Sequence, residues 1–255
     1  MVMNLPRLLS SEVERRLHLK RRLNRLRRKK HRLIVGIAVD ESASMLDAAI
    51  VSVSGSGDET VLMLKGFASR ELPGELSAAI AALGSSDDFE YEDAAGINFL
   101  ILHNMMRLYE QLLDSSGIAS NKVDLISVED FQVGDFSFPI DPMTLSEMTN
   151  RLVSSRFYIG SGDEKSEEMP VSRALLRSML DHMIDRFGLD TEVRKAAAVA
   201  LLGNEAIFNE RASEVVNETG AGERKRRRTL KTMKKAAGIE GEGTSYLYGE
   251  FHFPD

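Results

Sequence analysis

The sequence contains no cysteine and no long apolar run, and each absence excludes a class of protein. Without thiols the chain can form neither a disulfide framework nor a thiolate metal site, and a reducing, cytoplasmic setting is the simplest expectation. No stretch approaches the roughly 18 to 20 uninterrupted apolar residues that span a bilayer. The N-terminus carries charge where a signal peptide would need an apolar run, so we do not expect export.

Acidic residues are scarce in two short segments that are rich in lysine and arginine. Residues 1–32 hold 12 basic and two acidic residues, and residues 224–235 hold 8 basic and no acidic residues. Residues 33–222 hold 13 basic and 32 acidic residues, so two cationic arms flank an acidic body. This pattern predicts binding to RNA, DNA or an anionic membrane surface, or to the acidic body of a neighbouring copy. Because both arms lack aromatic residues, contacts to nucleic acid would be to phosphates and not to stacked bases.

The residues that we assign to polyanion binding are Arg15, Arg16, Arg21, Arg22, Arg25, Arg27, Arg28, Lys29, Lys30, Arg224, Lys225, Arg226, Arg227 and Arg228. Within the first arm, leucine and valine recur every three or four residues, which predicts a helix over residues 6–32. Its apolar stripe is narrow and its other faces are cationic. Two interpretations stay open: an exposed arm that docks on an anionic partner, and a solvated helix that partly frays.

Three apolar runs with short links predict an antiparallel meander. The predicted strands are 33–40, 47–54, 60–67, 123–127 and 152–159. The predicted helices are 73–83, 95–113, 142–150, 171–186 and 191–209. Asp141 should cap the helix at 142–150, and Pro142 should be its first residue. Residues 244–253 read either as a late strand or as an adhesive tail.

The order β-β-β-α-β-α-β with flanking helices predicts an α/β fold, with a mixed sheet of the ribonuclease-H-like or actin-like kind. We divide the chain into a basic helical arm (1–32), this domain (33–222) and a basic segment with a C-terminal tail (223–255).

The run LIVGIAVDESASMLDAAIVSV (33–53) resembles the first hairpin of the anhydro-N-acetylmuramic acid kinases. These sugar kinases of the actin and hexokinase type phosphorylate an anhydro sugar in peptidoglycan recycling, a branch of amino sugar metabolism. Residues 67–83, 123–159 and 188–222 resemble later segments of that family, in the family's order. Residues 165–187 are too few to hold the family's adenosine pocket and catalytic aspartate, so the resemblance implies that the second ATPase lobe is largely missing.

Several chemical positions depart from the family pattern. The family's first phosphate loop reads Gly-Thr-Ser-x-Asp-Gly, whereas this chain has Asp40-Glu41-Ser42-Ala43-Ser44-Met45, without glycine. Each carboxylate placed about 4 Å from a phosphate costs roughly 4 kcal/mol at an effective dielectric near 20. The remnant of the phosphate and magnesium loop that the resemblance implies comprises Asp40, Glu41, Ser42, Ser44 and Asp47.

The remnant of the sugar site that the resemblance implies comprises Glu129, Asp130, Gly160, Gly162 and Lys195. Residues 128–132 replace the family's Ser-His-Gly-Gln-Thr, and Lys195 replaces an acidic residue near the sugar. The turn at 160–163 reads either as a substrate loop or as a solvent-exposed turn, because glutamates follow it. The five histidines lack metal-ligand spacing, so we predict no metal site.

We therefore expect a degenerate homologue of the kinase, a pseudoenzyme that serves as a binding or assembly module without a cofactor. Its partner would be another protein or a further copy of the chain. One alternative is an active kinase that uses ATP and magnesium and completes its cleft by oligomerisation, with Ser42, Ser44 and Asp47 near the phosphate. Another is a protein that binds RNA or an anionic surface through its basic arms.

Overall fold

The computed structural model describes residues 5–40, 44–56, 59–83, 91–129, 131–133, 136–138, 141–161, 169–170, 187–208 and 245–252. The helices are α1 (Leu5–Arg28), α2 (Gly74–Leu83), α3 (Tyr91–Ser116), α4 (Pro142–Thr149), α6 (Thr191–Phe208) and a short 3-10 helix, Ser120–Lys122. The strands of the main sheet are β1 (Arg32–Val39), β2 (Met45–Ser54), β3 (Val61–Glu71), β4 (Leu125–Val128), β7 (Val153–Ser161), β8 (Met169–Pro170) and β9 (Ser245–His252). Strands β5 (Phe131–Val133) and β6 (Phe136–Phe138) form a separate two-stranded sheet.

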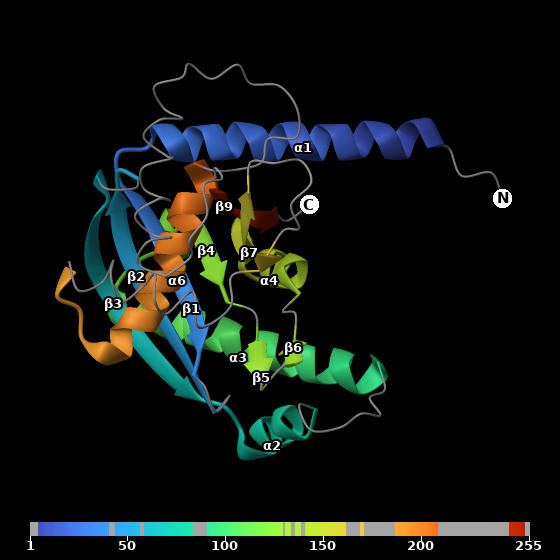
Figure 1. Cartoon of the computed structure of the whole chain (residues 1–255), viewed down its shortest axis with the longest axis vertical. Coiled ribbons are helices and arrows are strands. Elements are labelled where there is room, and N and C mark those ends of the chain that lie inside the picture. Colours follow the sequence, from blue (N-terminus) through green and yellow to red (C-terminus); the bar gives the residue numbers. More distant parts are fainter. Residues whose placement is uncertain are drawn as a thin grey trace.

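The main sheet is mixed, and its strands run in the order β3-β2-β1-β4-β7-β8 (Figure 1). Strands β1, β2 and β3 form an antiparallel meander, as the sequence predicts. Strand β4 is parallel to β1, and β7 is parallel to β4. Both β8 and β9 pair with β7 in the antiparallel sense. The predicted mixed α/β class is therefore confirmed.

Two apolar clusters cover the two faces of this sheet. Alternate residues of β1 divide between them, because successive side chains of a strand point to opposite faces. Ile34 and Ala38 join α6 and the second half of α1 on one face, while Val35 and Ile37 join α2, α3 and α4 on the other. Burial on both faces explains why this central strand reads as a continuous apolar run.

Helix α6 packs directly on β1 because small residues meet at the contact. A Cβ atom on Gly36 would lie 1.9 Å from the backbone oxygen of Ala196 and 2.5 Å from the backbone nitrogen of Ala200. From Ala196 to Ile207 every residue of α6 that carries a side chain is buried. The alanine-rich helix thus fixes the sheet from one side.

Helix α1 crosses the end of the sheet at which β1 begins (Figure 1). Leu23 and Leu26 are buried in the cluster that contains α6. Arg27 donates a 2.7 Å hydrogen bond from Nε to the carbonyl oxygen of Ile207, near the C-terminus of α6. The second half of this segment is therefore neither a free arm nor a fraying helix, because its leucine stripe packs against α6. Its cationic face stays exposed at Arg21, Arg25 and Arg28.

Other differences from the predicted elements are short or local. The prediction missed the β5 and β6 hairpin and β8, since strands of two or three residues carry too little periodicity to recognise. Of the two interpretations of 244–253, the strand is right, and the tail is wrong. The two helices predicted at 73–83 and 95–113 correspond to α2 and α3, although the predicted order counts only one helix between β3 and β4. The predicted helix at 171–186 and the basic run at 224–235 lie outside the described residues.

Candidate functional site

The carboxyl ends of β1 and β4 bring two of the predicted site residues to one edge of the sheet. Asp40 directly follows β1, and Glu129 directly follows β4, its neighbour in the sheet. The backbone nitrogen of Glu129 donates to the carbonyl oxygen of Ile37 at 3.2 Å. In open α/β sheets, ligands bind outside the carboxyl ends of the parallel strands, so this edge is the first candidate for a site.

Asp40 binds within its own turn. Its Oδ1 accepts from the backbone nitrogens of Ser44 and Met45 at 2.7 and 2.8 Å, and its Oδ2 accepts from Ser44 Oγ at 3.0 Å. These bonds close the connection between β1 and β2, and they use Ser44 donors that a phosphate loop would direct at its ligand. Of the other predicted phosphate-loop residues, Glu41 and Ser42 lie outside the described residues.

Asp47 lies inside β2, opposite Ala38 of β1. Its Oδ1 accepts from Ser69 Oγ of β3 at 2.5 Å. This side chain therefore bridges two neighbouring strands of the sheet, β2 and β3, two residues beyond the turn that contains Asp40.

Glu129 and Lys195, two of the predicted sugar-site residues, form an ion pair. Lys195 Nζ on α6 lies 3.6 Å from Glu129 Oε2, and their side chains are 23% and 8% exposed. Gly160 is the second-last residue of β7, where it pairs with Tyr246 of β9. Asp130 and Gly162 are not among the described residues. Within the described ranges, no group of three or more histidine or acidic side chains is arranged to hold a metal ion.

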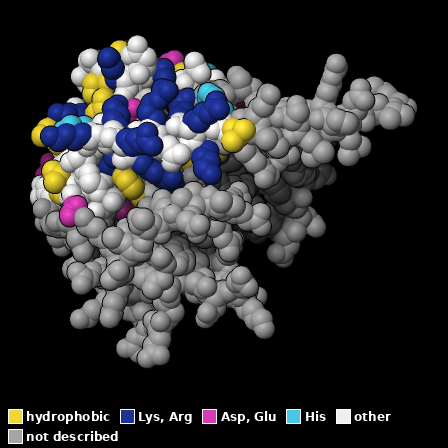
Figure 2. Space-filling model, turned by 90° about the horizontal axis from the view of Figure 1, so that it is seen from above, with side chains coloured by type: hydrophobic (Ala, Val, Ile, Leu, Met, Phe, Trp, Pro, Cys, Tyr) yellow, Lys and Arg dark blue, Asp and Glu magenta, His cyan; other side chains and the backbone are white. Residues whose placement is uncertain are grey.

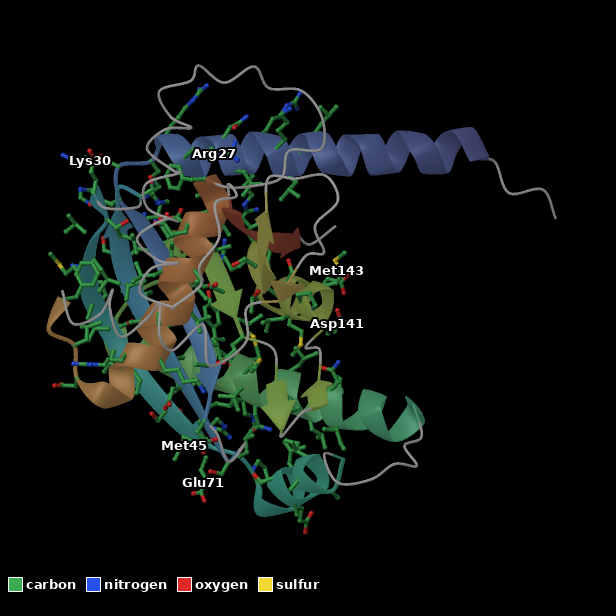
Figure 3. All side chains as sticks on the ribbon, viewed as in Figure 1. Arg27, Lys30, Met45, Glu71, Asp141 and Met143 are labelled. Atoms are coloured by element: carbon green, nitrogen blue, oxygen red, sulfur yellow. The ribbon has the colours of Figure 1, made fainter. Side chains whose placement is uncertain are left out.

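The opposite edge of the sheet carries the cationic face of α1. Seen from the α1 side, lysine and arginine side chains gather over this helix (Figure 2). In Figure 3, Arg27 and Lys30 lie at this end of the sheet, and Met45 and Glu71 lie at the other. Among the predicted polyanion-binding residues, Arg27 binds α6, and Lys29 binds Asp124 through Nζ at 2.6 and 2.8 Å. Arg21, Arg25, Arg28 and Lys30 are exposed.

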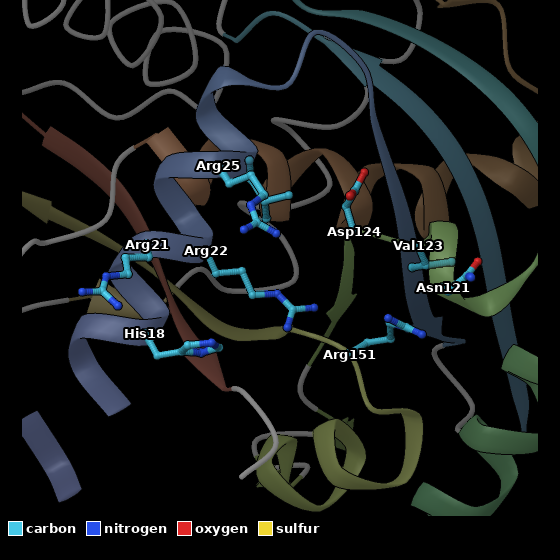
Figure 4. Close-up of a pocket in the computed structure, with 9 residues that line it drawn as sticks. His18, Arg21, Arg22, Arg25, Asn121, Val123, Asp124 and Arg151 are labelled. Atoms are coloured by element: carbon cyan, nitrogen blue, oxygen red, sulfur yellow. The ribbon is translucent and has the colours of Figure 1, made fainter. Parts of the chain in front are cut away.

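A pocket of about 540 Å³ opens between α1 and the segments that lead into β4 and β7. It is lined by His18, Arg21, Arg22, Arg25, Leu26, Asn121, Val123, Asp124 and Arg151. His18, Arg22 and Arg25 project from α1 into the space that separates the helix from Arg151 and Asp124 (Figure 4). Among the described lining residues, four arginines therefore share the pocket with one carboxylate.

That carboxylate is engaged outside the arginine cluster. Asp124 accepts from Lys29 Nζ and, at 2.9 Å, from the backbone nitrogen of Leu33. Burial lowers the pKa of the Arg22 guanidinium, and the positive charges of Arg151 and Arg25 lower it further, against the opposing effect of Asp124. An arginine keeps its proton at neutral pH despite such a shift, so the pocket holds concentrated positive charge.

The sequence prediction missed Arg151, which comes from the other side of the pocket. Asn150 ends α4 in the left-handed conformation, with φ of 52°, and turns the chain towards β7. Ser146 then fixes the next residue, since its Oγ donates to the carbonyl oxygen of Arg151 at 2.6 Å. An asparagine at the end of a predicted helix is a recognisable stop signal. It locates Arg151 after the turn but does not reveal that α1 lies opposite.

No protein-family profile matches this chain, and no curated protein matches it. Within the described residues, no helix has the length and apolar character needed to cross a membrane.

Proposed function

We propose that this chain is a non-catalytic binding or assembly module with a ribonuclease-H-like or actin-like fold, derived from a sugar kinase of the anhydro-N-acetylmuramic acid type. The sheet supports this fold. Three antiparallel strands are followed by β4 and β7, which add in parallel at the free edge of β1. This is the arrangement expected of the first lobe of an actin-like ATPase.

The ion pair between Lys195 and Glu129 carries the proposal that catalysis is lost. It lies at the carboxyl ends of the parallel strands β1 and β4, where a kinase of this kind would bind its substrates. A positive charge beside a carboxylate favours its ionised form and so makes it a weaker base, and it offsets the negative charge that would attract a magnesium ion. Breaking the pair would leave a buried charge without its counter-ion, which disfavours rearrangement around a substrate.

The turn after β1 supports the same conclusion. A phosphate loop needs backbone N–H groups that point at the anion. Here the N–H groups of Ser44 and Met45 donate to the carboxylate of Asp40. The aspartate therefore occupies these donors itself, and its negative charge would repel a polyphosphate.

Calorimetric titration of the purified chain tests the proposal. Magnesium-ATP and 1,6-anhydro-N-acetylmuramic acid are titrated separately. Each titration is repeated over a range of protein concentrations, so that both the monomer and any oligomer are tested. An active sugar kinase is titrated in parallel as a positive control. We expect heat of binding from neither ligand. Binding of both, followed by phosphorylation of the sugar at ordinary kinase turnover, would overturn the proposal in favour of a kinase completed by oligomerisation.

A further inference from the structure

We propose that the pocket between α1 and the chain around Asp124 and Arg151 binds a backbone phosphate of double-stranded nucleic acid, held by Arg22, Arg25 and Arg151. This inference goes beyond the proposed function. It concerns the opposite edge of the sheet and requires neither a kinase ancestry nor a loss of catalysis.

The pocket is suited to an oxyanion because its charges come from two separate elements. Arg22 and Arg25 belong to α1, whereas Arg151 precedes β7 and its Nε donates to Ser120 Oγ at 3.4 Å. Burial lowers the pKa of Arg22, and the neighbouring positive charges of Arg151 and Arg25 lower it further. An anion placed between them would replace repulsion with charge-assisted hydrogen bonds, which guanidinium groups form well with phosphate.

The surface around the pocket indicates a polymer and not a small anion. Arg21, Arg25 and Arg28 follow one another at spacings of four and three, so they share one face of α1 and are all exposed. His18, Arg22 and Arg25 have the same spacing and face the pocket. A continuous row of this kind can contact successive phosphates, whereas a single small ligand would leave most of it unused.

A membrane surface is a poorer partner for this half of the helix. An interfacial helix inserts its apolar face among lipid chains. Leu23 and Leu26 are 0% and 4% exposed because they pack against α6, so this face is already occupied. The cationic face remains, and among the described side chains of α1 Leu17, 49% exposed, is the one large apolar residue that solvent reaches freely. A single leucine is a small anchor beside several arginines.

The absence of aromatic residues from α1 favours a duplex over a single strand. Proteins that hold single strands stack bases on aromatic side chains. Duplexes are held through the regular spacing of their phosphates, and basic side chains are sufficient for this contact. RNA and DNA duplexes share this chemistry, so the experiment includes both.

Fluorescence anisotropy with the full chain tests the inference. The probes are a labelled RNA duplex, a DNA duplex of the same sequence and the corresponding single strands, over a series of salt concentrations. The pocket variant is Arg22→Gln/Arg151→Gln. The control is Lys65→Gln/Arg107→Gln, which removes the same charge from exposed positions on β3 and α3. Circular dichroism and thermal melts establish that each variant folds, and the single variant Arg25→Gln replaces the pocket variant if it does not.

We expect the wild type to prefer a duplex over its single strands. The pocket variant should raise Kd about tenfold and lower the slope of log Kd against log salt by about one to two, as for the loss of one or two phosphate contacts. The control should change Kd less than about twofold, because its charges lie outside the contact. Equal weakening by both variants would overturn the inference. So would a result in which neither duplex binds at physiological salt.

Discussion

Arg32 illustrates how a single residue can look like part of a charged arm and yet belong to the core. Its side chain is only 1% exposed. Its guanidinium donates to Asn204 Oδ1 at 2.8 Å, to the carbonyl oxygen of Lys29 at 2.8 Å and to that of Gly55. It also lies 4.9 Å from the centre of the Phe208 ring. One residue thus joins the end of α1, the turn after β2 and the end of α6.

Replacing Arg32 should destabilise the fold. Arg32→Met removes the donors while keeping much of the side-chain volume, and it leaves buried carbonyl and amide oxygens unsatisfied. We expect the free energy of unfolding to fall by about 2 to 4 kcal/mol. Arg28→Met, at an exposed position of α1, should change it by less than about 0.5 kcal/mol. Urea denaturation measures both, and equal losses would show that Arg32 is not a structural link.

The ion pair at the other edge should behave as a coupled unit. Lys195→Met removes the positive charge that lies 3.6 Å from the buried carboxylate of Glu129, and we expect a loss of about 2 to 3 kcal/mol in the free energy of unfolding. The double variant Glu129→Gln/Lys195→Met should be more stable than Lys195→Met alone, because the buried charge is gone. Urea denaturation of the full double-mutant cycle measures the coupling. Strictly additive effects would contradict the pairing of Glu129 with Lys195.

At the scale of elements, the close approach of α6 to β1 depends on Gly36. Any side chain there would overlap the backbone of Ala196 and Ala200. Backbone atoms cannot move aside as a flexible side chain can, so α6 would have to shift away from the sheet.

We expect Gly36→Val to abolish cooperative unfolding or lower the free energy of unfolding by more than about 4 kcal/mol, as for severe overpacking. Gly96→Ala is the matched control, since nothing lies within 4 Å of its added Cβ and it belongs to α3. Alanine favours a helix over glycine, so this control should gain about 0.5 to 1 kcal/mol. Circular dichroism melts compare the two, and a Gly36→Val protein with a wild-type melt would contradict the described contact.

Helix α4 was the element most fully predicted from the sequence. Asp141 accepts from the backbone nitrogens of Met143 and Thr144 at 3.0 and 3.3 Å, and Pro142 begins the helix. We expect Asp141→Ala to cost about 1 kcal/mol, the typical value of a lost N-cap. Asp141→Asn keeps an acceptor and should retain most of that free energy in urea denaturation. A fully stable alanine variant would contradict the role of the cap.

Local chemistry explains which features could be predicted. The capping aspartate, the turn after β2 and the apolar run of β1 each act within a few residues, and the meander and α4 were found from them. The docking of Leu23 on α6 and the meeting of Arg22 with Arg151 depend on residues far apart in the chain, and no local pattern reveals them. Glu129 and Lys195 are both predicted site residues, but the sequence does not predict that they pair with each other, because Glu129 follows β4 and Lys195 lies on α6.

At the scale of the whole molecule, β9 returns to the sheet and pairs with β7 from Val153 to Ser161. We expect Leu247→Pro to lower the melting temperature by several degrees, because proline removes an N–H from a strand that pairs along its length. Leu247→Thr keeps that N–H and suits a strand, so it separates the backbone effect from a change of side chain. A proline variant that melts at the wild-type temperature in thermal scans would argue that β9 adds nothing to stability.

The hydrogen bond between Arg27 and Ile207 joins residues 180 positions apart, and the bond between Arg32 and Asn204 spans 172. Contacts of such long range raise the contact order of the fold. They slow folding because the chain loses the conformational entropy of a large loop before the contacts form and offset that loss. While the chain is being synthesised, α1 leaves the ribosome long before α6 exists. Leu23 and Leu26 are then exposed, and the cationic pocket has only one wall. The proposed polyanion-binding surface is therefore complete only late in synthesis, once the segments that carry Asp124 and Arg151, and then α6, have packed against α1.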